Sequence, residues 1–231
     1  MISALRSFAR RLRRNSDKPD WRNLRSVSPV SRVFGLDRGT PIDRYYIENF
    51  LKRNSTSIRG RVLEVAEDVY TKRFGTAVGR SEILHFDSSN RQATIVGDLS
   101  RPDTLPENAV DCFICTQTLN FIFNIDGAIK GIYHLLSQNG IALITVAGIS
   151  QISRYDMERW GDYWRFTSKS AMRLFADVFG EENVHVESFG NVLSSVAFLE
   201  GISSEELTAE ELDFKDDDYQ MSIAIVARKN S

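Results

Sequence analysis

Short β-prone segments alternate with amphipathic helical segments along residues 43–226, and this alternation constrains the fold most strongly. The run 141–146 (IALITV) is almost entirely apolar, which is typical of a strand buried on both faces of a parallel sheet. The order predicts an α/β chain with a doubly wound, mostly parallel sheet of seven strands. Strands are predicted at 61–65, 82–85, 93–96, 110–115, 141–146, 184–186 and 221–226, and helices at 43–54, 128–136 and 168–179.

Two of these helices carry end signals. Gln138, Asn139 and Gly140 follow the helix at 128–136, and a glycine in that place is a helix C-terminal signal. Thr167 or Ser168 is expected to cap the helix at 168–179, because a side-chain hydroxyl can accept a bond from its first N–H groups.

The composition is that of a globular protein. The chain has 231 residues, of which 42% are hydrophobic and 26% charged, and this suits one domain with extensions. No apolar run reaches the roughly 18 residues of a membrane span, and no long apolar stretch follows the N-terminal charges as in a secretory signal. The 29 basic and 31 acidic residues nearly balance, so we expect no nucleic-acid partner. Two cysteines favour a reducing compartment, and we expect a cytoplasmic protein.

The charges gather at the two ends of the chain. Residues 6–25 hold eight Lys and Arg, and Leu5, Phe8 and Leu12 share one face of a short helix. This stretch is either solvated or lies on an anionic membrane surface, which would place the chain at the inner face of a membrane. Residues 200–218 hold nine Asp and Glu. They form either a solvated surface helix and loop or a latch for the basic N-terminus of this chain or a neighbour.

Three carboxylates, Glu64, Glu67 and Asp68, lie in and just after the end of the first predicted strand. A dinucleotide-binding turn would carry G-x-G-x-x-G here, so that backbone N–H groups could approach a pyrophosphate. Three carboxylates would repel a pyrophosphate, which disfavours NAD and FAD. The turn favours a ligand with a cationic end and neutral hydroxyl groups.

Further polar side chains follow the later strands. Asp87 comes 23 residues after the glutamate of the first strand, near the spacing expected for an acid that bonds ribose hydroxyls. Asp98 and Leu99 follow the third strand, where they either hold an adenine or form a plain turn. Thr116 and Gln117 follow the fourth. Because parallel strands present their carboxyl ends at one edge, we expect these residues to line a ligand site.

Aromatic and charged residues are interleaved in the segment 154–167. This mixture suits a site that stacks on a ring and bonds hydroxyl groups, although an aromatic cluster that seals the sheet edge would have the same composition. The candidate substrate-binding residues are Arg154, Tyr155, Trp160, Tyr163 and Trp164.

Cys112 and Cys115 have a spacing that invites a zinc or redox interpretation. Residues three apart in a strand point to opposite faces, and further cysteine ligands are lacking. We therefore expect two buried, reduced thiols and no metal site. His134 is expected to pack in its helix, and His185 to lie in a strand far from the ligand edge.

The run 110–146 carries the most specific resemblance to a known family. With VDCFIC, TQTL, the following AI and LL, and NGIALITV, it resembles the fourth strand, helix, turn and fifth strand of class I S-adenosylmethionine-dependent methyltransferases of the small methyltransferase-domain type. The resemblance spans about 61–147, and 41–50 is similar to the helix that covers the cofactor. GRVLEV, YTKRFG and ISQISRYDMERWGDYWRFT resemble a branch linked to surface-polysaccharide and glycosyltransferase systems.

The resemblance implies a Rossmann-like methyltransferase fold at 31–231, a basic extension at 1–30, and S-adenosylmethionine as the cofactor. It assigns eight residues to the cofactor: Glu64, Ala66 and Asp68 at the methionine end, Asp87 at the ribose, Asp98 and Leu99 at the adenine, and Thr116 and Gln117 on the path to the methyl group.

The first turn departs from the family pattern E-x-G-x-G-x-G, because Ala66, Asp68 and Tyr70 stand at the glycine positions. Three functions therefore remain open, and the first two are of different kinds. One is an enzyme that methylates a hydroxyl of a sugar or glycan-related small molecule. The other is a non-catalytic binding or scaffold subunit in a glycan-assembly system. A different small-molecule α/β enzyme, or a methyltransferase with another acceptor, is the third alternative.

A hydroxyl acceptor would benefit from a general base. Asp156 and Asp162 are the candidates, with His85 a poorer one. The expected partner is a small-molecule or glycan substrate, and a homodimer is an open alternative for the assembly.

Overall fold

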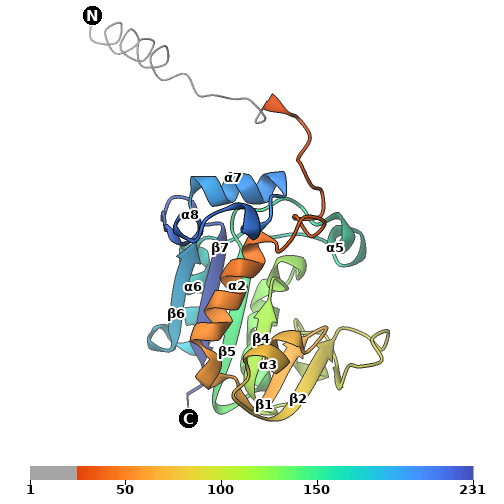
Figure 1. The fold of residues 1–231 in the computed structure, drawn as a ribbon. Coiled ribbons are helices and arrows are strands. Elements are labelled where there is room, and N and C mark those ends of the chain that lie inside the picture. Colours follow the sequence, from red (N-terminus) through yellow and green to blue (C-terminus); the bar gives the residue numbers. More distant parts are fainter. Residues whose placement is uncertain (1–24, 231) are drawn as a thin grey trace, which may run out of the picture.

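The computed structural model describes residues 25–230, and a single seven-stranded sheet runs through them (Figure 1). The strand order is β3-β2-β1-β4-β5-β7-β6, and only β7 runs antiparallel to its neighbours. The predicted doubly wound, mostly parallel sheet is confirmed. The strands are β1 (Arg59–Val65), β2 (Ala77–His85), β3 (Ile95–Val96), β4 (Val110–Thr116), β5 (Leu136–Ala147), β6 (Val184–Phe189) and β7 (Ser222–Arg228).

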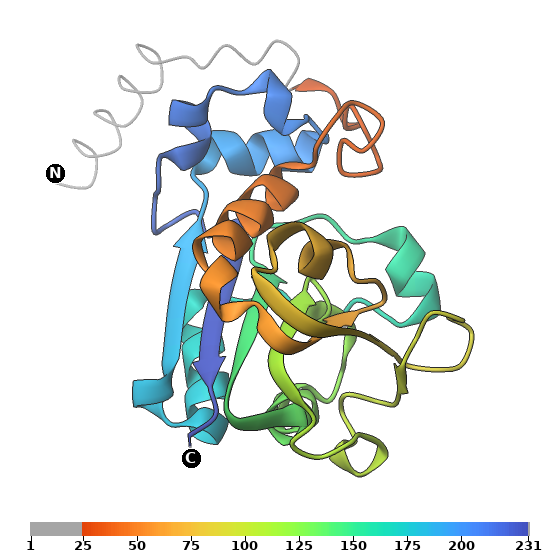
Figure 2. The same ribbon diagram turned by 60° about the horizontal axis from the view of Figure 1, so that its bottom comes forward.

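Helices cover both faces of this sheet (Figures 1 and 2). Two of them, α4 and α6, pack on one face, and α2 and α3 pack on the other. At the top of Figure 1, α7 lies beside the start of α2. The described α-helices are α2 (Ile42–Arg53), α3 (Val69–Phe74), α4 (Ile125–Leu135), α5 (Arg154–Arg159), α6 (Ser168–Phe179), α7 (Val192–Glu200) and α8 (Ala209–Asp213).

The sheet buries a separate apolar layer on each face. Phe113 and Phe175 belong to the layer under α4 and α6, and Phe50 belongs to the layer under α2. Cys115 lies in the first layer and Cys112 in the second, as expected for residues three apart in a strand. Both thiols are free, and burial raises the pKa of each to about 12, so the predicted pair of buried, reduced cysteines is confirmed.

One helix-end prediction is confirmed and one is wrong. Thr167 caps α6 by accepting a bond from the N–H of Ser170 (3.2 Å). The helix α4 ends at Leu135 and is not closed by Gly140. Its next residue already pairs with Val110 as the start of β5, and the left-handed residue of the turn is Asn139 (φ 63°). Strand pairing therefore takes over the backbone before the glycine signal is reached.

Three short helices, α3, α5 and α7, have no counterpart among the predicted elements. The third of them had a readable signal. Asn191 accepts a bond from the N–H of Ser194 in a capping box, and Gly201 closes the helix with φ 72°. The apolar run between these two residues does not keep a clear helical period, because both sides of α7 carry apolar residues.

The acidic stretch 200–218 holds the chain that follows the basic extension. The guanidinium of Arg38 lies 2.6 Å from the carboxylate of Glu206, and the N–H of Thr40 donates to Glu205 (2.9 Å). These bonds lower the pKa of each glutamate to about 2. The predicted apolar face of the N-terminal helix lies outside the described residues, and the domain boundary at residue 30 stays a prediction. None of the described helices combines the length and apolar character that crossing a bilayer requires.

Candidate functional site

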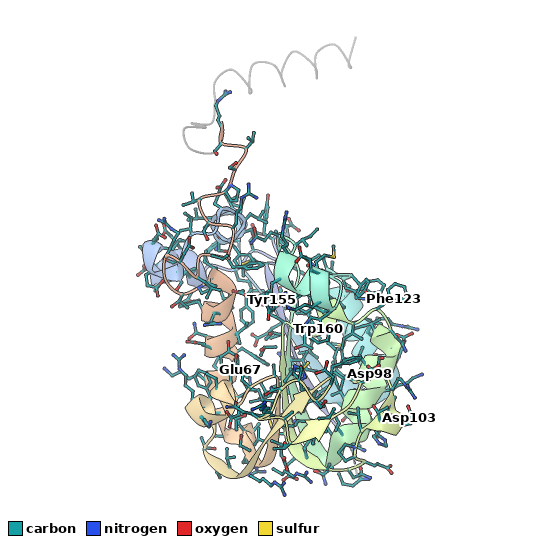
Figure 3. The ribbon with its side chains drawn as sticks, turned by 90° about the vertical axis from the view of Figure 1, so that its right-hand side faces the viewer. Glu67, Asp98, Asp103, Phe123, Tyr155 and Trp160 are labelled. Carbon is teal, nitrogen blue, oxygen red and sulfur yellow. The ribbon has the colours of Figure 1, made fainter. Side chains whose placement is uncertain are left out.

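A cavity of about 960 Å³ opens at the carboxyl ends of the central strands. It lies where the strand order reverses, between β1 and β4, which is where ligands bind in doubly wound sheets. Its wall comes from the ends of β1, β2, β4 and β5, from the start of α2, and from the segment 150–165. Figure 3 labels four residues of this wall, Glu67, Asp98, Phe123 and Trp160.

The turn after β1 keeps a left-handed backbone without a glycine. Ala66 has φ 67° and lines the cavity. Its N–H donates to the carbonyl of Leu84 in β2 (2.9 Å), and the N–H of Glu67 donates to the carbonyl of Val65 (2.9 Å). Left-handed geometry costs an alanine on the order of 1 kcal/mol, so these bonds hold a strained turn at the cavity wall.

Glu64, which the resemblance assigns to the methionine end, is committed to the fold. It is buried, and its carboxylate accepts bonds from the N–H of Tyr70 (3.1 Å) and from the N–H and hydroxyl of Thr71 (2.8 Å each). Burial raises the pKa of this carboxyl, and the bonds from Thr71 oppose that shift. Glu64 lines the cavity but mainly fixes the first turn of α3.

Two predicted cofactor residues, Asp68 and Asp87, are not part of the cavity wall. Asp68 is bonded to the ammonium of Lys72 (2.8 Å) and the hydroxyl of Ser81 (3.1 Å), and these contacts lower its pKa. Asp87 is exposed, and its Oδ1 lies 3.2 Å from Nδ1 of His85. His85, at the end of β2, is the residue that reaches the wall.

The other four predicted cofactor residues, Asp98, Leu99, Thr116 and Gln117, come together in the cavity wall. Oδ1 of Asp98 accepts bonds from the N–H (2.8 Å) and hydroxyl (2.7 Å) of Ser100, so the carboxylate is held in an Asx turn. Gln117 directly follows β4 with a left-handed backbone (φ 48°), and its N–H donates to the carbonyl of Thr145 (2.8 Å).

Of the two predicted general bases, Asp162 is fully engaged and Asp156 is less so. The side chain of Asp162 is 1% exposed, and Arg165 binds both of its oxygens, at 2.5 and 2.9 Å. Arg165 also donates to the carbonyls of Gln151 and Trp164, so this pair fastens the segment 150–165. Asp156 accepts one short bond from the hydroxyl of Ser153 (2.5 Å) and faces the cavity.

The aromatic segment divides between the cavity and the core. Trp160 and Tyr163 line the cavity and are 38% and 49% exposed. Trp164 packs against the core instead, and its indole N–H donates to the carbonyl of Ile122 (3.0 Å). Tyr155 and Arg154 lie on α5 outside the wall. Part of the segment therefore faces the cavity and part of it packs against the core.

Several residues of the wall are not among those predicted from the sequence. Asp43 and Arg44 come from the first turn of α2, and Phe123 extends the aromatic rim next to Tyr163, with 5.3 Å between the ring centroids. Asn120 is buried, and its carbonyl accepts the N–H of Tyr163 (2.9 Å). The resemblance of 41–50 to a covering helix was the signal that could have identified the first two.

The wall carries more negative than positive charge. Six Asp and Glu line it against three Arg, a formal charge of −3 with His85 neutral. Burial raises the pKa of Asp43 to about 6, although the N–H and the charge of Arg44 oppose that shift. Such a wall attracts a cation and disfavours a polyanion.

Comparisons with known proteins identify the fold. No protein-family model and no curated protein matches the chain. An S-adenosylmethionine-dependent methyltransferase from Mesorhizobium loti is 16% identical with a TM-score of 0.52, covering 84% of this chain and 100% of that one. One from Archaeoglobus fulgidus is 14% identical with a TM-score of 0.52, covering 80% and 94%. The N-methyltransferase NodS from Bradyrhizobium japonicum WM9, in complex with S-adenosyl-L-homocysteine, is 10% identical with a TM-score of 0.51, covering 88% and 95%.

These similarities show that the chain has the Rossmann-like methyltransferase fold. At such low identity they speak for the fold alone, and a fold of this kind hosts many functions.

Proposed function

We propose that the chain is an S-adenosylmethionine-dependent methyltransferase. The observation that carries this proposal is a roomy, net negative cavity at the reversal point of a methyltransferase-type sheet. Its volume lies in the range of small-molecule sites, and its charge complements a sulfonium and an ammonium. When bound, the cofactor supplies a methyl group on a positively charged sulfur, which a nucleophile displaces in line.

Two of the predicted residues suit the adenine of this cofactor, and two suit the approach to its methyl group. Asp98 has one carboxylate oxygen bonded within its turn, which leaves the other to accept a bond from an adenine amino group or a hydroxyl. Leu99 gives an apolar neighbour for the ring. Thr116 and Gln117 would line the approach to the methyl group. Glu64, Ala66 and Asp68 act in this proposal mainly by shaping the first turn, and Asp87 by holding His85.

We further propose a sugar or glycan hydroxyl as the acceptor, in a surface-polysaccharide system. Aromatic rings at the rim and neutral polar side chains in the wall are the usual groups that bind sugars, and Trp160, Tyr163 and Thr118 supply both kinds. Asp156 is the better general base of the two candidates, because Asp162 has both oxygens bound to Arg165. Arg154, Tyr155 and Trp164 would act around the site through α5 and the core.

A non-catalytic binding subunit is the second candidate, and the strained turn at Ala66 favours it. The side-chain methyl group of Ala66 stands at a position where a glycine would let a ligand approach the backbone more closely. A transfer assay separates the two functions. We expect the full chain to move a radiolabelled methyl group from S-adenosylmethionine to a glycan fraction, and Asp156→Asn to reduce that transfer at least tenfold. Cofactor binding without transfer would support the subunit, and the absence of any cofactor binding would overturn the proposal.

For the remaining chain, we propose a basic extension at 1–30 on a methyltransferase-like domain at 31–231, in a cytoplasmic protein that docks at the inner face of a membrane. The basic run and its apolar residues support this placement. Flotation with anionic liposomes tests it. The full chain should float, a chain that lacks residues 1–26 should not, and equal behaviour of the two would contradict membrane docking.

A further inference from the structure

The first turn of α2 brings two opposite charges to the cavity wall. Asp43 and Arg44 are neighbours in the chain, and both line the cavity. The carboxylate of Asp43 accepts one bond, from the N–H of Arg44 (2.9 Å). Within residues 25–230 no side chain donates to Asp43, and no carboxylate lies within ion-pair distance of Arg44. The pair thus presents to the cavity an anion and a cation, neither of which has an ion-pair partner among the described side chains.

The other charged groups of the wall have partners of their own. Glu64 is held by the start of α3, and Asp162 and Arg165 hold each other. Asp156 is bonded to the hydroxyl of Ser153. The guanidinium of Arg159 lies 3.5 Å from the ring centroid of Tyr155.

Two carboxylates remain besides Asp43. Asp98 lies with Leu99 beyond β3, in the part of the wall proposed for the adenine. Glu67 is exposed and follows Ala66 in the first turn. It is the one rival of Asp43 near the end of β1, but no guanidinium stands beside it in sequence.

We propose that Asp43 and Arg44 receive the amino-acid end of the cofactor, Asp43 its ammonium and Arg44 its carboxylate. This inference rests on the proposed function and adds to it the residues that recognise one half of the ligand. An adjacent anion and cation match a zwitterion, and each bond would be charge-assisted. The covering helix α2 then binds the amino-acid end of the cofactor, because the carboxylate oxygens of Glu64 already accept bonds from the start of α3.

Two probes of known structure separate the halves of the ligand. S-adenosylhomocysteine carries the amino-acid end, and 5′-methylthioadenosine has the same thioether nucleoside without it. Titration calorimetry on the full chain should give tighter binding for the first. Asp43→Asn and Arg44→Gln should each weaken S-adenosylhomocysteine by about tenfold and change 5′-methylthioadenosine less than about twofold. Lys52→Gln, an exposed residue on the same helix, is the matched control and should change neither.

The outcomes distinguish this inference from the proposed function. If the wild-type chain binds neither probe, the proposed function fails. If it binds both and the two variants behave like Lys52→Gln, only the recognition by α2 fails. A selective loss in Glu67→Gln in place of Asp43→Asn would move the ammonium to the first turn and also overturn it. Circular dichroism of each variant, expected to match the wild type, confirms that folding is retained.

Discussion

Ala66 and Gln117 directly follow the adjacent strands β1 and β4 with the same left-handed backbone, at φ 67° and 48°, and both line the cavity. Neither is a glycine, so each carries the cost of this geometry at the point where the strand order reverses. Strained residues of this kind gather at functional sites because the surrounding structure fixes them. Here the bonds to Leu84 and Thr145 do so.

The strain at Ala66 predicts that a glycine stabilises the fold. Ala66→Gly should raise the free energy of unfolding by about 0.5–1 kcal/mol, because relief of the left-handed alanine exceeds the entropy that a glycine loses on folding. Urea denaturation measures this change. Ala93→Gly is the control, because Ala93 is not among the residues with positive φ, and it should lower stability. A loss of stability in Ala66→Gly would contradict the strain.

The pair of Asp162 and Arg165 predicts a structural effect for a residue first expected to be catalytic. Asp162→Asn should lower stability by about 1–3 kcal/mol, because it leaves a half-buried guanidinium without its anion. Thermal unfolding measures the loss. The exposed pair of Arg173 and Asp177 provides the control, and Asp177→Asn should change stability by less than about 0.5 kcal/mol. Equal effects of the two substitutions would show that the pair of Asp162 and Arg165 does not stabilise the fold.

Asp98 and Asp87 should differ as ligand-binding residues. Asp98→Ala should weaken S-adenosylhomocysteine by about 1–3 kcal/mol, because its carboxylate is at the cavity wall. Asp87→Ala should have a much smaller effect, because Asp87 is exposed and reaches the cavity only through His85. Calorimetric affinities compare them, and a larger loss in Asp87→Ala would restore the role in ribose binding that the sequence suggested.

Ligand affinity should depend on pH through Asp43. Its pKa of about 6 means that the carboxylate is charged above pH 7 and gains a proton as the pH falls through 6. The neutral carboxyl would no longer pair with the ammonium of the ligand, so S-adenosylhomocysteine should bind more weakly at pH 5.5 than at pH 8. The groups around Asp43, namely Arg44, Glu64 and Tyr70, are kept in Asp43→Asn, which removes only the carboxyl of Asp43. That variant should therefore lose the part of the pH dependence that comes from Asp43. The same pH curve in both proteins would contradict the assignment.

The carboxyl of Asp43 should make the stability of the ligand-free chain depend on pH in the opposite direction to its effect on ligand affinity. A carboxyl whose pKa rises on folding binds its proton more tightly in the folded state, so its contribution to stability falls as the pH rises from about 4 through 6. Asp43→Asn should therefore stabilise the free protein at pH 8, by on the order of 1 kcal/mol, and gain little at pH 4. Unfolding curves at the two pH values check this difference, and destabilisation at pH 8 would show that the charge is well solvated.

The sequence predicts the sheet well because local patterns carry that information. The run 141–146 is apolar at nearly every position, and Cys112 and Cys115 fall on opposite faces because strand geometry has a period of two. Side-chain pairing in the site does not follow from such patterns. The commitment of Asp162 to Arg165, and of Glu64 to α3, depends on which donors folding brings within reach.

It was harder still to predict which residues just after a strand line the cavity. Asp68 and Asp87 have the right spacing, yet local partners, Lys72 and His85, draw them away from the cavity wall. Asp43 and Arg44 were overlooked because they lie far from the strand ends in sequence and join them only when α2 packs on the sheet. Contacts between residues so far apart in the sequence are determined by the packed tertiary structure.

Titration of the full chain with S-adenosylhomocysteine at pH 8 tests the account most directly. We predict saturable heat for one ligand per chain, with a dissociation constant in the micromolar range (about −8 kcal/mol), and a rise in the unfolding temperature. No heat and no thermal shift at millimolar ligand would contradict an adenosyl-binding cavity, and with it the proposed methyl transfer.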